Sequence, residues 1–274
     1  MNVLFWSIAA LAMQFGSPAS PNGSPGAHWV PETPRGLAPC TEPLSPVRNL
    51  PSEIGEEVSY DLEAMKIRLG TVAFTVSRAG TFGGLAVTEY RSEVESVGLA
   101  DALIQLEGEA ASIVVDADAR PVQAAARYTY QSDGRREMLR FSDLGRLVHS
   151  ERTEKGKRSV QEPHFKKPVY DLLTSFYVAR RLPPLTRGCV VIYAGQEAYT
   201  LWLEPEDTEV LDTALGPQKA ERYKVRYASN KNKRVHEMRL WIGSDDHRLP
   251  LKAEGKSRWS PLAILKHYRA GRLP

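Results

Sequence analysis

The stretch RLWIGSDDHRLPLKAEGK, residues 239–256, decides the fold of this chain. Two runs of alternating residues flank a polar turn, which is the pattern of a β-hairpin. Leu240 and Ile242 share one face of the first arm, and the two-residue period of a strand places Trp241 on the other face. Pro250 has no N–H to donate to a neighbouring strand, so it lies at the start or the edge of the second arm. The stretch predicts a hairpin within a β-sheet and indicates no chemistry.

The turn of this hairpin contains adjacent acidic and imidazole side chains, Asp245, Asp246 and His247. Neighbours in a turn rarely converge on one metal ion, and Asp is favoured in turns because its side chain bonds nearby backbone. We therefore expect a structural turn, in which the guanidinium of Arg248 contacts Asp245 or Asp246, beside a largely buried Trp241. The predicted structural residues of the hairpin are Trp241, Asp245, Arg248 and Pro250.

Short alternating runs bounded by turns recur from residue 54 to the end of the chain. The apolar positions change phase at Gly70, which predicts a β-bulge or a bend. Asp133-Gly134 is a strong two-residue hairpin signal. One helix is predicted over 170–182, where apolar residues recur at three- and four-residue steps before two prolines. The pattern predicts a mainly all-β fold, a curved antiparallel meander shaped as a half-barrel or barrel, with this one helix.

The sequence allows two alternative structures for each of two segments. Residues 97–106 (VGLADALIQL) have helical spacing and predict a short helix or an irregular crossover. Residues 259–268 (WSPLAILKHY) predict either a closing strand or a short terminal helix.

The N-terminus has the pattern of an export signal. Residues 3–13 form an apolar run too short to span a bilayer, and a small-x-small site follows at 17–19. This predicts a signal peptide over 1–19, although the segment has no Lys or Arg and a buried N-terminal helix is the alternative. Residues 20–51 are rich in Pro, Gly and Ser and predict an extended linker. Residues 52–274 then form a single β-rich domain, with no transmembrane segment after signal cleavage.

The chain has two cysteines, Cys40 in the predicted linker and Cys189 at the start of a predicted strand. In an exported protein an even count permits one disulfide, which would pin the linker to the sheet. Two unpaired thiols are the alternative.

Composition and motifs argue against several classes of function. The 274 residues are 42% hydrophobic and 25% charged, as in globular proteins, and the net charge of +3 is small for a nucleic-acid-binding protein. The chain contains no G-x-S-x-G nucleophile motif, no pair of histidines four residues apart and no glycine-rich phosphate loop between a strand and a helix. We expect no catalytic residues, no metal and no cofactor.

Three pieces of the chain resemble a known family. They are IGEEVSYDLEAMKIRLGTVAF (54–74), YDLLTSFYVARRLPPLTRG (170–188) and the hairpin stretch at 239–256. In order and spacing they resemble the bacterial envelope family "domain of unknown function 3108" over roughly residues 52–268. The run W-x-x-x-D-x-x-R-x-P-x-K is the most specific piece. Two positions depart from the family's pattern, Val178 after the helical tyrosine and Cys189 where an acidic residue is common.

The resemblance implies a secreted or periplasmic antiparallel β domain, similar in outline to the half-barrels of lipoprotein-carrier proteins. It implies no activity, because the family has no established catalytic residues to carry over. The leading hypothesis is an exported, non-enzymatic envelope protein whose curved sheet holds a lipid or acyl chain. The alternative is a structural or assembly module with a filled core, which contacts envelope proteins through its surfaces. The volume inside the sheet distinguishes the two.

Overall fold

The computed structural model describes residues 37–38, 40–41, 43–44, 53–231, 234–257 and 259–272. The signal peptide predicted over 1–19 and most of the linker predicted over 20–51 lie outside these residues.

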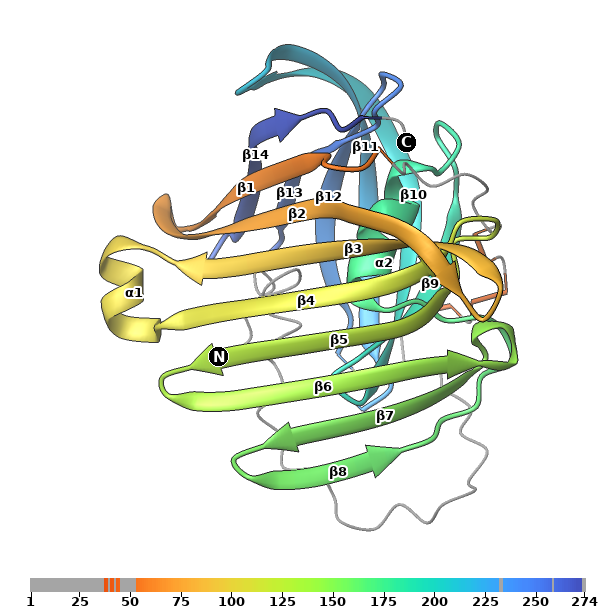
Figure 1. Cartoon of the computed structure of the whole chain (residues 1–274). Helices are drawn as coiled ribbons and strands as arrows, with labels where there is room; N and C mark the ends of the chain where they lie inside the picture. The colour runs from red at the N-terminus through yellow and green to blue at the C-terminus, as the bar shows by residue number, and fades with distance from the viewer. Residues whose placement is uncertain are drawn as a thin grey trace.

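The described residues form one antiparallel sheet of fourteen strands (Figure 1). Each strand pairs with the next along the chain, except that β8 does not pair with β9, and β1 pairs with β14. The strands are β1 (Glu57–Ala64), β2 (Ile67–Phe82), β3 (Leu85–Ser96), β4 (Leu106–Val115), β5 (Pro121–Tyr130), β6 (Asp133–Ser142), β7 (Leu147–Glu154), β8 (Lys157–Gln161), β9 (Gly188–Ala194), β10 (Glu197–Thr213), β11 (Gly216–Ser229), β12 (His236–Gly243), β13 (Pro250–Gly255) and β14 (Leu262–Arg269). β8 and β9 are the two edges, so the sheet is not closed, and Figure 1 shows that it is curved. The predicted all-β meander is confirmed.

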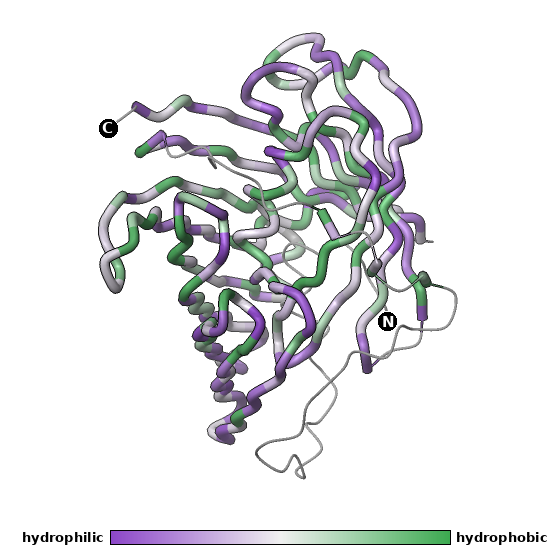
Figure 2. Tube along the Cα trace, turned by 90° about the vertical axis from the view of Figure 1, so that its right-hand side faces the viewer, coloured by the Kyte–Doolittle hydropathy of each residue, from purple (hydrophilic) through white to green (hydrophobic). Residues whose placement is uncertain are grey.

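The alternation of apolar and polar residues that predicted the strands matches the alternation of buried and less buried side chains. In β1 the side chains of Val58, Tyr60 and Leu62 are buried, and the residues between them are less so. The same alternation of polar and apolar residues can be followed along the tube in Figure 2. Since one face of each strand is apolar, turning that face inward buries apolar surface and lowers the free energy of the folded state.

The phase change near Gly70 is a β-bulge, as predicted. The register passes from Leu62 opposite Gly70 to Glu63 opposite Arg68, so Leu69 has no partner on β1. A Cβ atom at Gly70 would lie 2.3 Å from the carbonyl oxygen of Glu95, so only glycine allows β3 to approach here.

The two ends of the sheet overlap. The inner face of β5–β7, including Leu139 and Val148, packs with Tyr193 of β9 and Ala198 of β10 in one apolar cluster. Tyr193 and Ala198 lie on the opposite face of their strands from the main core residues Ile192 and Tyr199. The β9 end of the sheet is therefore rolled inside the β8 end, and the sheet is a spiral.

The helix α2 (Leu172–Arg180) lies inside the curve, behind β3–β5 in the view of Figure 1. Phe176 stacks on Phe74 with ring centroids 4.0 Å apart, and Tyr177 contacts Tyr90 at the same centroid distance. The predicted helix is confirmed with shorter bounds, because Tyr170 bridges Ile192 of β9 instead of starting the helix.

The two open segments are resolved. Residues 98–104 form the short helix α1 (Gly98–Ile104), and the segment after Trp259 forms the strand β14. The 3-10 turn η2 (Asp143–Gly145) precedes β7. In the part of the chain that the structure describes, no helix is both long enough and apolar enough to cross a bilayer.

Cys40 and Cys189 form a disulfide with their Cα atoms 5.5 Å apart. It ties the described residues of the predicted linker to the start of β9, as the sequence suggested for a bridged pair.

Candidate functional site

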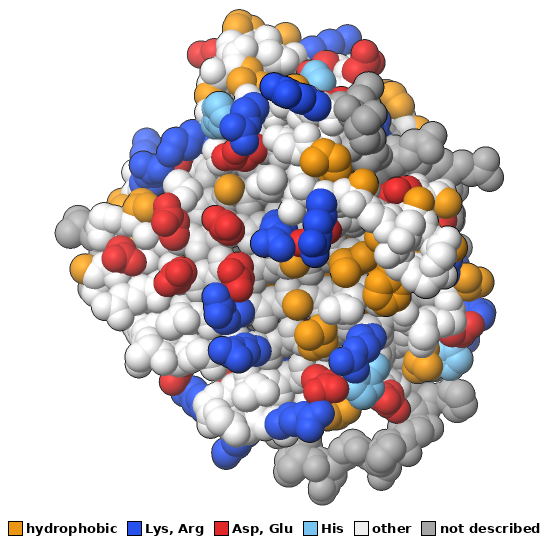
Figure 3. Space-filling view, in the orientation of Figure 1, with side chains coloured by type: hydrophobic (Ala, Val, Ile, Leu, Met, Phe, Trp, Pro, Cys, Tyr) orange, Lys and Arg blue, Asp and Glu red, His pale blue; other side chains and the backbone are white. Residues whose placement is uncertain are grey.

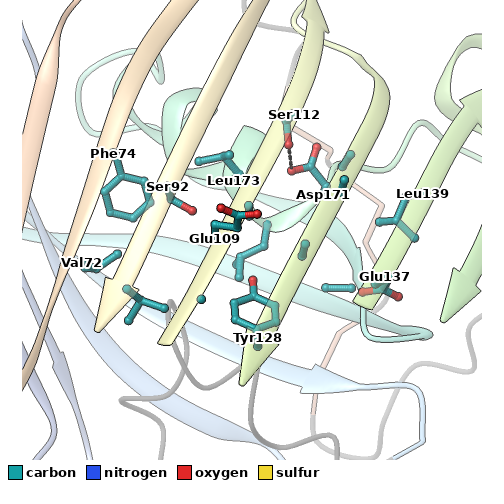
Figure 4. Close-up of a pocket in the computed structure, with 18 of the residues that line it drawn as sticks. Val72, Phe74, Ser92, Glu109, Ser112, Tyr128, Glu137, Leu139, Asp171 and Leu173 are labelled. Carbon is teal, nitrogen blue, oxygen red and sulfur yellow. Dashed lines mark hydrogen bonds between the residues drawn. The ribbon is translucent and has the colours of Figure 1, made fainter. Parts of the chain in front are cut away.

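The inner face of the sheet borders a partly open cavity of about 70 Å³, between β2–β6 and the start of α2 (Figure 4). Its apolar lining includes Val72, Phe74, Leu139 and Leu173, and its polar lining includes Ser92, Ser112, Tyr128, Glu137 and Asp171. A water molecule needs roughly 10–15 Å³ measured in this way, whereas pockets for organic ligands span about 300–1,000 Å³. The cavity has room for a few waters and is too small for an acyl chain.

Small residues on the inner face create this space. Gly108 and Ala110 of β4 face Tyr128 and Ala126 of β5. A Cβ atom at Gly108 would lie 2.2 Å from a ring carbon of Tyr128, so the tyrosine ring occupies the place of the missing side chain. The run of alanines at 124–126 is the sequence signal for the cavity, because strands usually carry larger β-branched residues.

Asp171 fixes the start of α2 beside the cavity. Its carboxylate accepts the backbone N–H of Thr174 at 3.0 Å and the hydroxyl of Thr174 at 2.5 Å. It also accepts the hydroxyl of Ser112 at 2.6 Å, the bond drawn dashed in Figure 4. Burial raises the pKa of Asp171, and these hydrogen bonds offset part of the rise. Both oxygens are engaged in capping the helix and tying it to β4, which is a structural role.

Arg180 fixes the end of α2 through a buried ion pair. The two guanidinium Nη atoms contact the two carboxylate oxygens of Glu56, and Nη2 also donates to the backbone oxygen of His247 at 3.2 Å. Both side chains are at most 2% exposed. Burial would lower the pKa of Arg180, but Glu56 raises it above its ordinary value. Because both ends of α2 are held by buried polar contacts, the helix is a fixed part of the interior.

Side chains, instead of a strand ladder, hold the overlapping ends of the sheet. The carboxylate of Glu137 on β6 accepts the backbone N–H groups of Gly195 and Gln196, at 2.8 and 3.1 Å, from the turn between β9 and β10. Arg152 of β7 donates to the carbonyl of Gly195, and Ser159 of β8 donates to the Gln196 side chain. Burial raises the pKa of Glu137, while the Gly195 N–H lowers it.

The hairpin stretch forms β12 and β13, which lie between β11 and β14. Trp241 is 4% exposed, its indole N–H donates to Glu209 at 2.6 Å, and the Lys252 ammonium lies 4.5 Å from the ring centroid. Pro250 begins β13 opposite Ile242. These contacts serve the packing of the sheet.

Arg248 contacts a different partner from the one expected. Its backbone N–H donates to the side chain of Asp245 at 2.9 Å, but its guanidinium pairs with Glu221 of β11, with two contacts of 3.0 Å. The expected guanidinium contact with Asp245 or Asp246 is therefore wrong. The two aspartates are exposed, whereas Glu221 is buried, and a buried carboxylate costs free energy unless a cation neutralises it.

Burial raises the pKa of Glu221, but hydrogen bonds from Arg248 and Tyr223 outweigh it and hold the pKa at about 2. The folded-state pKa is therefore below the unfolded value near 4.5. The stabilisation is complete above pH ~4.5 and is lost as the pH falls toward 2.

We expect Arg248→Gln to destabilise the protein above pH ~5, and the difference from wild type to shrink between pH ~4.5 and 2, since Glu221 then becomes neutral in both proteins. Urea unfolding at a series of pH values measures this difference. Arg239→Gln, which breaks an exposed contact with Glu206, is the matched control and should change stability little. A difference independent of pH would show that Glu221 does not carry the effect.

The outer face of β3 and β4 carries acidic side chains. On β3 and β4, Glu93 lies opposite Glu109 and Glu95 opposite Glu107. Figure 3 shows acidic side chains gathered on the face in front, with basic side chains beside them. Among the described residues, no group of three or more His, Cys, Asp or Glu side chains could hold a metal ion.

The family model described as "Protein of unknown function (DUF3108)" matches residues 57–263. No curated protein matches the sequence. Among solved structures, a β-barrel-like protein of domain of unknown function DUF1849 from Brucella abortus aligns over 80% of this chain and 98% of its own, at 8% identity and a TM-score of 0.51. At this identity the likeness shows the fold alone.

Two further structures align over 81% of this chain and 99% of their own. One is a lipoprotein candidate from Parabacteroides distasonis, at 11% identity and a TM-score of 0.36. The other is a candidate exported protein with a YmcC-like fold from Bacteroides fragilis, at 7% identity and a TM-score of 0.35. Both TM-scores are too low to support a conclusion about this chain.

Proposed function

The chain belongs to the DUF3108 family of proteins of unknown function, and from this premise we propose that it is an exported, non-catalytic envelope protein that acts through its surfaces. The observation that carries the proposal is the filled interior. α2 occupies the concave face, and the cavity beside it, of about 70 Å³, is roughly a quarter of the smallest usual ligand pocket. An interior filled to this degree favours a function at the outer surfaces.

The export part of the proposal is supported by the disulfide. Cys40 and Cys189 are bridged, and disulfides persist in oxidising compartments such as the periplasm and the extracellular space. The N-terminal signal pattern points the same way.

A carrier of a lipid or acyl chain is the second candidate. The apolar part of the cavity lining, which includes Val72, Phe74 and Leu173, favours it. To admit an acyl chain, α2 would have to leave the sheet. That motion breaks the buried pair of Arg180 with Glu56 and leaves both charges without partners, which is costly.

The interior can be tested with apolar probes. We expect wild-type protein purified from its own envelope to give the mass of the bare polypeptide by native mass spectrometry, and to bind neither a fluorescent fatty acid nor benzene. Phe176→Ala should bind benzene, because deleting a buried ring leaves a dry apolar cavity of a size that accepts small aromatic molecules.

Phe82→Ala, which removes an exposed ring at the tip between β2 and β3, is the control and should bind neither probe. A stoichiometric lipid on the wild-type protein, retained through purification, would contradict the filled interior and favour the carrier.

A further inference from the structure

The turn between β1 and β2 presents apolar side chains to solvent. It consists of Met65 and Lys66, and Ile67 follows as the first residue of β2. Met65 is 56% exposed and Ile67 is 55% exposed. In Figure 1 the turn lies at the left-hand end of the sheet, where α1 also lies. We call Met65, Lys66 and Ile67 the apex.

The stability of the hairpin does not account for the residues of the apex. Ala64 pairs with Ile67, so the turn has two residues, and Met65 and Lys66 have positive φ angles of 52° and 65°. Turns of this kind favour Asn and Gly, because other side chains are strained at positive φ. Met65 and Lys66 therefore cost free energy in the folded chain, and the exposed side chain of Ile67 gains little by burial. We take this as a sign of a contact outside the domain.

A tryptophan lies beside the apex. The backbone N–H of Met65 donates to the carbonyl of Trp259 at 3.1 Å, which ties this turn to the one between β13 and β14. The side chain of Trp259 is half-buried. Tryptophan is favoured where lipid meets water, because its ring is apolar and its indole N–H is polar. The apex and Trp259 therefore bring together the side-chain types of a membrane interface.

Lys66 gives the apex a positive charge. Behind it on β1, Asp61 and Glu63 are balanced by Arg68, which contacts Asp61 at 2.7 Å and lies opposite Glu63, and by Lys266, 3.5 Å from Asp61. Within the described part of the chain, Lys66 makes no ion pair. A cation beside exposed apolar side chains is the combination that anionic lipid surfaces attract.

We propose that the apex docks on the surface of a bilayer that carries anionic lipid. Met65 and Ile67 enter the boundary between headgroups and acyl chains, and Lys66 lies beside the phosphates. A lipid layer is the occupant because it can surround a convex two-residue turn, whereas a stable protein interface needs roughly 800 Å² from each partner. The contact is weak and reversible, since few side chains enter the lipid. The inference rests on the proposed function and names the partner of one outer surface.

The first test uses protein purified from its own envelope and vesicles of phosphatidylglycerol with phosphatidylethanolamine. In a flotation assay at low salt we expect the wild-type protein to float with the vesicles. Met65→Asp and Ile67→Asp should each lower the partition coefficient by at least about ten-fold, because a carboxylate replaces an apolar side chain in the lipid. Lys66→Gln should lower it by about five-fold on these vesicles, and should have little effect on phosphatidylcholine vesicles.

Phe82→Asp is the matched control, because Phe82 is 45% exposed and lies at the other end of β2. It should float as the wild type does, and thermal unfolding should show that every variant is folded. A wild-type protein that does not float, an equal loss in Phe82→Asp, or unchanged flotation of Met65→Asp and Ile67→Asp would overturn the proposal.

Trp259 provides an independent measurement. On vesicles with brominated acyl chains we expect the tryptophan fluorescence of the bound protein to be quenched, and Trp259→Phe to lose most of this quenching. Undiminished quenching in Trp259→Phe would mean that another part of the chain contacts the bilayer, and would overturn the proposal. The apolar-probe experiment on Phe176 can succeed or fail without changing these outcomes, because it tests the interior and the apex lies outside it.

Discussion

Arg180→Ala is expected to lower the free energy of unfolding by about 3–5 kcal/mol, because it leaves the buried carboxylate of Glu56 without its cation. The backbone oxygen of His247 would lose its donor in the same variant. Urea unfolding monitored by tryptophan fluorescence measures the change. This is a large part of the stability of an ordinary domain.

Two controls separate the loss of the partner from the loss of a charge. Arg187→Ala removes a guanidinium that is 67% exposed and 4.0 Å from Glu204, and should change stability by less than about 1 kcal/mol. The double variant Glu56→Leu with Arg180→Leu should cost clearly less than the sum of the two single changes, since no unpaired charge then remains. Additive losses would mean that the two groups do not act as a pair.

Trp241→Ala should also cost about 3–5 kcal/mol, the usual range for deleting a large buried aromatic side chain. Trp241→Phe should cost less, because it keeps most of the apolar area and loses the hydrogen bond to Glu209. Asp245→Ala should cost least, since its carboxylate is exposed and accepts the Arg248 N–H within the turn. Thermal unfolding ranks the three variants.

One outcome would contradict the structural role of the hairpin. If Trp241→Ala and Asp245→Ala left the melting temperature unchanged but abolished a biological activity, the hairpin would be a functional site and its structural role would be wrong.

Most elements of the fold could be predicted from local sequence patterns. Alternating burial predicted the strands, three- and four-residue spacing predicted α2, and a phase change predicted the bulge beside Gly70. These features depend on residues close in sequence, and the physical forces that shape them act over the same short range. The hairpin at 239–256 was predictable for the same reason.

The contacts that fix the interior were not predictable, because they join residues distant in sequence. Glu56 and Arg180 are 124 positions apart, and Arg248 reaches Glu221 only because β11 and β12 pair in one particular register. A shift of one residue would turn every side chain of the strand to the other face. The overlap of the sheet ends has no local sequence signal. Glu137 and Gly195 are 58 residues apart, and they come into contact because the whole sheet is curved.

The rolled sheet also limits how copies can polymerise through their edges. A flat open sheet has two free edges, and head-to-tail pairing of one edge with the other produces fibres without end. Here the edge of β9 is covered by Tyr170 and lies inside the spiral. Among the described residues no strand pairs with the outer edge of β8, where Lys157 and Arg158 are exposed. Pairing of β8 with β8 of a second copy would be two-fold symmetric and would cover the β8 edge of each copy. Growth along the sheet therefore stops at two molecules.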